Sequence, residues 1–146
     1  MVTGIRQAVA ALEISSASER NWASPVSATW YPARNWVTMG STERAAAESP
    51  FGGPIGHGFL TLSLFVPMWS QILLVTDVTM GVNYGLNKVR FPAPVPVGSR
   101  IALTATLLEV EEVKGGGLQL TVGGVIEREG SEKPVCVLES LTRLYG

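Results

Sequence analysis

The stretch ERAAAESPFGGPIGHGFLTLSL, residues 43–64, holds the clearest structural signal in the chain. Its middle part, residues 49–54, is rich in Pro and Gly, and these residues predict a loop that leads into a helix. From residue 57 to about residue 74 apolar side chains occupy most of a helix circumference, so we expect a core helix that is covered on nearly every side. Pro67 lies inside this run, where it should kink the helix or end its first segment.

Four strand signals follow the helix, separated by residues that interrupt a ladder. Residues 78–91 are rich in β-branched and aromatic side chains, and Pro and Gly residues at positions 92–98 end that run. Residues 101–113 alternate apolar and polar side chains, which is typical of a half-buried strand. Glycine-containing turns at 115–117 and 130–133 bound a third strand, residues 118–128, and precede a fourth, residues 135–144. One helix followed by four antiparallel strands predicts an α+β domain whose sheet wraps the helix.

Length and charge limit the classes of function. At 146 residues the chain has the length of a single domain, so we expect one site. A net charge of -1 leaves no basic excess for nucleic acid or for an anionic lipid surface. Residues 58–76 are uncharged and about as long as the shortest segment that crosses a bilayer, but their polar side chains and the lack of basic flanks favour a buried helix. We expect no nucleic-acid partner, no membrane partner and a cytoplasmic location.

The single cysteine, Cys136, lies in the apolar run 135–138. One cysteine forms neither an intramolecular disulfide nor a metal site by itself. Its surroundings favour the role of a small buried side chain over that of a reactive thiol. The sequence therefore predicts no metal and no cofactor.

Residues 1–42 lack the periodicity of the remainder. Residues 7–14 could form a short helix, but residues 15–42 mix Ser, Asn, Pro and Gly with Trp22, Trp30 and Trp36. Three large aromatic side chains are unusual in a solvated tail, yet no pattern assigns them a core. We therefore divide the chain into an atypical N-terminal segment, residues 1–42, and a domain of residues 43–146.

Two blocks carry a resemblance to a known family. Residues 43–64 and a second stretch, NYGLNKVRFPAPVPVGSR at 83–100, resemble blocks of the MaoC-like (R)-specific enoyl-CoA hydratases and occur in the same order. The resemblance implies a hotdog fold, in which an antiparallel sheet wraps a long central helix, and a homodimer whose sheets join edge to edge. It also implies a lyase of fatty acid metabolism that adds water to a trans-2-enoyl-CoA and gives an (R)-3-hydroxyacyl-CoA.

The same resemblance assigns candidate residues for binding an acyl-CoA thioester. The helix start at Gly58 presents backbone N–H groups, which suit a thioester oxygen that gains negative charge. Ser63 matches a family serine that faces the substrate, Gly85 leaves room along a strand, and Arg90 could meet a CoA phosphate. Each has a plainer alternative. Ser63 could bond back to a carbonyl of the preceding turn, Gly85 could mark a bulge, and Arg90, like Lys88, could solvate a strand face.

The chain departs from the family at its catalytic pair. In the hydratases an Asp and a His ahead of the 43–64 block hold the water that is added. One alignment of that region places Ala33 and Thr38 at the two positions, and another places Arg34 and Met39 there. Neither alignment supplies an acid or a base, so the catalytic residues remain unknown.

The whole chain contains one Asp, Asp77, and one His, His57, which in the family belongs to the loop scaffold. His57 is thus the remaining histidine candidate for catalysis. A positioned acid–base pair contributes about 10²- to 10⁴-fold to rate, so we expect impaired hydratase activity. Two alternatives stay open: a non-catalytic acyl-CoA-binding or heterodimer partner subunit, and a thioesterase in which Glu48 activates water. A frame change or deletion ahead of residue 43 would also explain the missing pair, and sequencing the coding DNA tests that explanation.

Overall fold

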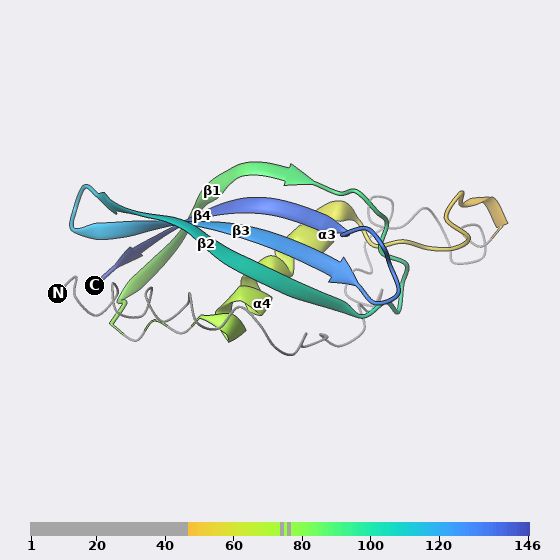
Figure 1. Ribbon diagram of the computed structural model, residues 1–146, viewed down its shortest axis with the longest axis horizontal. Helices are drawn as coiled ribbons and strands as arrows, with labels where there is room; N and C mark the ends of the chain where they lie inside the picture. The colour runs from red at the N-terminus through yellow and green to blue at the C-terminus, as the bar shows by residue number, and fades with distance from the viewer. Residues whose placement is uncertain (1–46, 74, 76) are drawn as a thin grey trace.

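The computed structural model describes residues 47–73, 75 and 77–146. In chain order it contains helices α3 (Gly58–Ser63) and α4 (Phe65–Ile72), then strands β1 (Met80–Arg90), β2 (Ile101–Val113), β3 (Gly117–Arg128) and β4 (Cys136–Tyr145). The strands form one antiparallel sheet in the order β1-β4-β3-β2, and both helices lie on the same side of it (Figure 1). The predicted α+β arrangement is confirmed. The expectations for residues 1–42, Trp22, Trp30 and Trp36 among them, lie outside the described residues.

The strands form where alternation and turn residues predicted them. β2 and β3 pair along their full lengths, from Ile101 opposite Arg128 to Val113 opposite Gly117. In the turn between them Gly115 and Gly116 have φ values of +90° and +78°, which glycine adopts without a steric penalty. Because this turn fixes the register, the apolar side chains of β2 and β3 share the face that the helices cover.

The helical run is divided at Leu64, as the position of Pro67 predicted. Pro67 is the third residue of α4, where a missing backbone N–H costs little because the first turn of a helix lacks intrahelical acceptors. Continuing α3 without a break would instead require an N–H from residue 67 to the carbonyl of Ser63. The chain takes a turn at Leu64 and starts a second helix.

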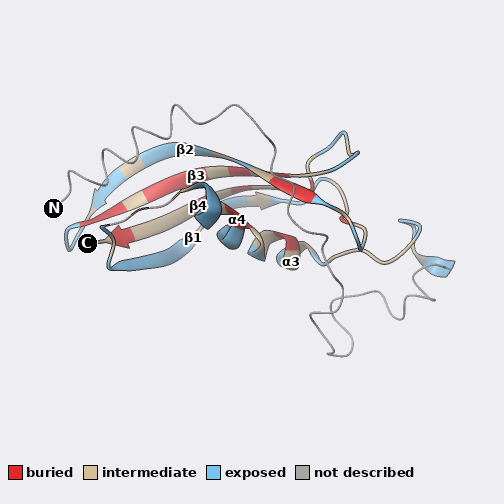
Figure 2. Cartoon of the chain, turned by 90° about the horizontal axis from the view of Figure 1, so that it is seen from below, coloured by how far each residue is buried: buried red, intermediate tan, exposed pale blue. Residues whose placement is uncertain are grey.

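The sheet covers one side of the two helices. Thr61, Phe65 and Met68 are buried on the side that faces the strands. On the other side Phe59 is 69% exposed and Val66 is 52% exposed (Figure 2). The expectation of a helix covered on nearly every side is therefore not met by the described residues, because a single sheet can cover only one face of a helix. No helix in the described part of the chain is long and apolar enough to cross a membrane.

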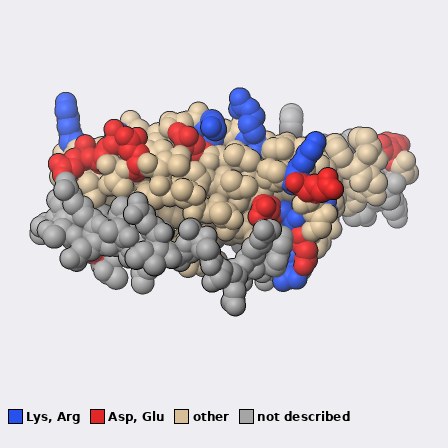
Figure 3. Space-filling model, in the orientation of Figure 1, with Lys and Arg blue, Asp and Glu red and all other residues tan. Residues whose placement is uncertain are grey.

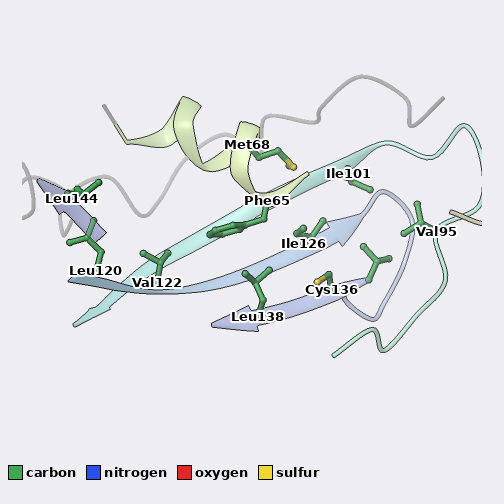
Figure 4. Close-up of a cluster of buried hydrophobic side chains, with 11 residues drawn as sticks. Phe65, Met68, Val95, Ile101, Leu120, Val122, Ile126, Cys136, Leu138 and Leu144 are labelled. Carbon is green, nitrogen blue, oxygen red and sulfur yellow. The ribbon is translucent and has the colours of Figure 1, made fainter. Parts of the chain in front are cut away.

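Phe65 joins the helices to the sheet. A Cβ atom placed on Gly124 of β3 would lie 2.9 Å from the Phe65 ring, so this glycine leaves the space that the ring occupies. The ring also stacks on Trp69, with their centroids 6.3 Å apart. The surrounding buried core, drawn in Figure 4, comprises Met68, Val95, Ile101, Leu120, Val122, Ile126, Val135, Cys136, Leu138 and Leu144.

Candidate functional site

A cavity of about 290 Å³ lies beside the start of α3. It is formed by the loop that precedes α3 and by the segment that follows β1. These two segments are joined by backbone hydrogen bonds, because the Gly56 N–H donates to the Val95 carbonyl (2.7 Å) and the Val97 N–H donates to the Pro54 carbonyl (3.0 Å). The lining residues are Phe51, Ile55, Gly56, Gly58, Thr61, Phe91, Pro92, Ala93, Pro94, Val95 and Val135.

The lining is almost entirely apolar. Among the described residues that line the cavity, Thr61 is the only one whose side chain carries a polar atom. It is 4% exposed, and its hydroxyl donates to the His57 carbonyl at 3.5 Å, which is long for a hydroxyl hydrogen bond. An apolar cavity with one weakly engaged hydroxyl suits a ligand that is mainly hydrocarbon.

Gly58 and Phe91 narrow the cavity beside the helix start. A Cβ atom on Gly58 would lie 3.2 Å from the Phe91 ring, which is closer than ordinary van der Waals contact. Phe59 meets the same ring edge-on, with centroids 6.4 Å apart, and stacks on His57 at 5.6 Å. Glycine at position 58 therefore allows the Phe91 ring to pack close to the helix start.

His57 caps helix α3. Its Nδ1 atom accepts a hydrogen bond from the Phe59 N–H at 3.2 Å, and its carbonyl accepts from the Leu60 and Thr61 N–H groups. The side chain is exposed and is not part of the cavity lining. This geometry gives His57 the role of an N-cap, which satisfies a backbone donor that the helix itself leaves without an acceptor.

The other candidates lie away from the cavity. Ser63 is exposed, and its hydroxyl donates to the Leu60 carbonyl at 2.7 Å. Gly85 sits at a register shift between β1 and β4, and Arg90 is exposed and donates to the neighbouring Val89 carbonyl at 2.8 Å. Each shows the geometry of its plainer alternative, and of the four substrate-binding candidates Gly58 is the one that lines the cavity.

No carboxylate or imidazole from the described residues lines the cavity. Glu48 is exposed and lies outside the lining, as do Lys88 and Asp77. The positions compared with the family's catalytic pair, residues 33, 34, 38 and 39, are outside the described part of the chain. Among the described residues no group of three or more His, Cys, Asp or Glu side chains could hold a metal ion.

Thr61 and Phe91 were missed by reasoning from the sequence. Thr61, Phe65 and Met68 are spaced by four and three residues, so a helix places all three on one face. That spacing could have identified Thr61 in place of Ser63. Phe91 had no comparable signal in the sequence. It directly follows the last residue of β1, whereas Gly58 is the first residue of α3, so their contact joins segments that are distant in the sequence.

Cys136 is fully buried, and burial raises the pKa of its thiol from 9.0 to about 11. This agrees with the predicted packing role. In the unfolded chain the thiol ionises first, so its contribution to stability should be complete below pH 9 and should be lost as the pH rises toward 11. Urea unfolding at several pH values should therefore show the stability difference between wild type and Cys136→Ala shrinking above pH 9. A difference that stays constant to pH 11 would contradict this prediction.

Comparison with known proteins gives three findings. The family model described as the MaoC like domain matches residues 38–128. A 3-hydroxyacyl-thioester dehydratase from Mycobacterium tuberculosis is 54% identical over 108 residues, which are 74% of this chain and 70% of that protein. A solved monoamine oxidase regulatory protein from Archaeoglobus fulgidus has a TM-score of 0.61 at 27% identity, over 71% of this chain and 68% of that one.

One further solved structure shares the fold. The ChsH1-ChsH2 complex from Mycobacterium tuberculosis matches with a TM-score of 0.63 at 15% identity, over 99% of this chain and 93% of the matched chain. At that identity the likeness concerns the fold alone. Together with the helix-on-sheet arrangement, these matches place the domain in the hotdog fold.

Proposed function

Since the chain belongs to the MaoC-like dehydratase family, we propose that it binds acyl-CoA thioesters in the cavity beside Gly58. We further propose that it interconverts trans-2-enoyl-CoA and (R)-3-hydroxyacyl-CoA at a reduced rate. The relative named as a 3-hydroxyacyl-thioester dehydratase supports the reaction class, because dehydration of a 3-hydroxyacyl thioester is the reverse of hydration of the enoyl thioester.

One observation carries the proposal. The residues matched by the family model, 38–128, include every cavity-lining residue except Val135. The cavity thus lies within the part of the chain that defines the family. Its apolar lining suits an acyl chain, and the helix start beside it suits a thioester carbonyl.

The chemistry assigns a role to Gly58. In hydration, water gives up a proton as its oxygen bonds to C3 of the enoyl group, and negative charge develops on the thioester oxygen until C2 takes up a proton. A backbone N–H aimed at that oxygen stabilises the charge, and removal of one such donor in other enzymes costs about 10²- to 10³-fold in kcat. The Gly58 N–H is the donor that we assign to this oxygen.

The reduced rate follows from what the cavity lacks. No acidic or basic side chain of the described residues lines it, so nothing in that part of the chain activates the water or returns the proton. His57 uses its Nδ1 atom to cap α3 and does not line the cavity. Loss of a positioned acid and base costs about 10²- to 10⁴-fold in rate, whereas binding depends on the apolar lining and is retained.

The acidic side chains of β2 lie at the end of the sheet away from the cavity. Figure 3 shows mixed acidic and basic side chains at the cavity end and acidic side chains at the opposite end, near the hairpin between β2 and β3. Glu109, Glu111 and Glu112 belong to that end of β2. Repulsion by these carboxylates disfavours the CoA phosphates at the hairpin end. At the other end Arg90 is the last residue of β1, and Arg100, directly before β2, pairs with Glu129 at 3.3 Å.

The test is hydration of crotonyl-CoA by the full chain, followed through loss of the enoyl-thioester absorbance, alongside thermal unfolding with and without the ester. We expect thermal stabilisation by the ester and turnover far below that of an active family hydratase measured in parallel. If the ester neither stabilises the protein nor is turned over, the proposal is refuted. Release of free thiol would instead identify a thioesterase.

A second candidate function is that of a partner subunit in a heteromeric hydratase. The absence of an acid or base from the described cavity lining favours it, and the structurally similar ChsH1-ChsH2 complex shows that the fold occurs in a two-protein assembly. Stabilisation by CoA esters without any turnover of crotonyl-CoA by the isolated chain is the result that would favour this candidate.

The chain is also proposed to form a homodimer through β1. This strand is at an edge of the described sheet, and residues 80–87 carry no charge. Met80, Val82, Tyr84 and Leu86 are exposed along it. An uncharged edge with exposed apolar side chains favours pairing with another strand, and a second copy of β1 offers a matching surface.

Introducing a lysine at Leu86 should shift the chain from dimer to monomer, because a charge buried at a strand edge opposes pairing. Leu86 pairs with the neutral Ser140 in β4, so the substitution places no like charge beside it within the sheet. The matched control is Thr104→Lys on β2, the strand at the other edge. Light scattering after size-exclusion chromatography measures the mass, and a dimer that survives in Leu86→Lys but dissociates in Thr104→Lys would show that the wrong edge was chosen.

A further inference from the structure

We infer that Thr61 is a specificity-determining residue, whose hydroxyl hydrogen-bonds an oxygen substituent on the acyl chain and makes the cavity prefer hydroxyacyl over saturated acyl thioesters. This inference rests on the proposed function, since it assumes that the acyl chain enters the cavity beside Gly58. It concerns a residue outside the acid–base chemistry that the hydratase reaction requires.

The first support is the poor engagement of the Thr61 hydroxyl. The side chain is 4% exposed, and its donated bond to the His57 carbonyl has an oxygen–oxygen distance of 3.5 Å. Hydroxyl hydrogen bonds are usually between about 2.5 and 3.0 Å, so this contact is weak. A hydroxyl offers one donor and two acceptor lone pairs, and most of that capacity is left unused by the described residues.

The second support is the apolar character of the other described residues that line the cavity. Ile55, Phe91, Val95 and Val135 offer hydrocarbon, and Gly56 and Gly58 offer no side chain. In such a cavity the Thr61 hydroxyl is the side-chain group that can distinguish a hydroxylated chain from a saturated one. A hydrogen bond in apolar surroundings is also stronger than the same bond in water.

The third support is the position of Thr61 along α3. Thr61 and Gly58 both line the cavity and are three residues apart, which is about 4.5 Å along a helix axis. With the thioester carbonyl at Gly58, an acyl chain that continues along the helix brings C3 and its oxygen toward Thr61. The 3-hydroxyl is therefore the substituent that Thr61 is placed to bind.

The test compares the affinities of 3-hydroxybutyryl-CoA and butyryl-CoA for the full chain by isothermal titration calorimetry. We expect the wild type to bind the hydroxylated ester about 2- to 10-fold more tightly, the usual range for one hydrogen bond. Thr61→Val keeps the shape of the side chain and should abolish the preference, so that the two esters bind with equal affinity. Thr61→Ser keeps the hydroxyl and should retain the preference.

Thr104→Val on the exposed face of β2 is the matched control and should leave both affinities unchanged. If neither ester binds the wild type, the proposed function fails. If both bind equally to the wild type, or if Thr61→Val keeps the preference, the proposed function stands and the inference about Thr61 is overturned. The wild-type comparison decides the matter even if Thr61→Val does not fold.

Discussion

Replacing Phe65 with alanine is expected to destabilise the protein by about 3–5 kcal/mol, the range measured for large aromatic side chains removed from a core. The Phe65 ring is 4% exposed and fills the space above Gly124 of β3. It also stacks on Trp69 of the same helix. Removing it would leave a cavity between helix and sheet. Urea unfolding at neutral pH, with the free energy of unfolding extrapolated to water, measures the loss.

The matched control is Val66→Ala, one residue further along α4. Val66 is exposed, so its truncation should change stability by less than about 0.5 kcal/mol. A substitution that adds volume on the sheet side of the same contact, Gly124→Ala, would put a methyl group 2.9 Å from the Phe65 ring and 3.2 Å from Leu138. Such overpacking costs about 1–3 kcal/mol, and less when Phe65 is first shortened to leucine. Equal costs for Phe65→Ala and Val66→Ala would mean that α4 does not pack on the sheet in solution.

The strands were predictable because their signals are local. Alternation along residues 101–113 and the glycines at 115–117 fixed both ends of β2 and the register of its hairpin with β3. The position of the helical run in the sequence was predictable, and Pro67 correctly indicated that the run is divided into two helices. How much of the helix is covered was not predictable. An apolar side chain such as Phe59 indicates that burial is favourable, but the sequence pattern does not say which surface provides it.

The candidate site was predictable only in part, because it is assembled from segments distant in sequence. Gly58 follows from the resemblance of residues 43–64, and it does line the cavity. Ser63 lies two residues beyond Thr61, about 200° around a helix, so it points away when Thr61 faces the cavity. The segment 91–95 closes the cavity from more than thirty residues away. Its prolines identified a break after β1 but carried no signal of a contact with α3.

Enlarging residue 58 should block ligand binding without unfolding the chain. A Cβ atom at this position would already lie 3.2 Å from the Phe91 ring, and valine adds two methyl groups beyond it at a residue that lines the cavity. Phe91 is 42% exposed, so it can move outward and relieve the contact in the free protein. A ligand in the cavity removes that freedom. An overpacking cost of about 1–3 kcal/mol, present only in the complex, lowers affinity roughly 5- to 150-fold.

Gly58→Val is therefore expected to bind butyryl-CoA roughly 5- to 150-fold more weakly than wild type in calorimetric titrations, with a similar thermal unfolding midpoint for the free protein. Gly53→Val is the matched control. Gly53 lies in the loop ahead of α3, a Cβ atom there would meet nothing within 4 Å, and the residue does not line the cavity. If both variants lose affinity equally, the loop as a whole governs binding. If Gly58→Val binds as tightly as wild type, the acyl chain does not use the cavity beside α3, and the site must be sought elsewhere on the domain.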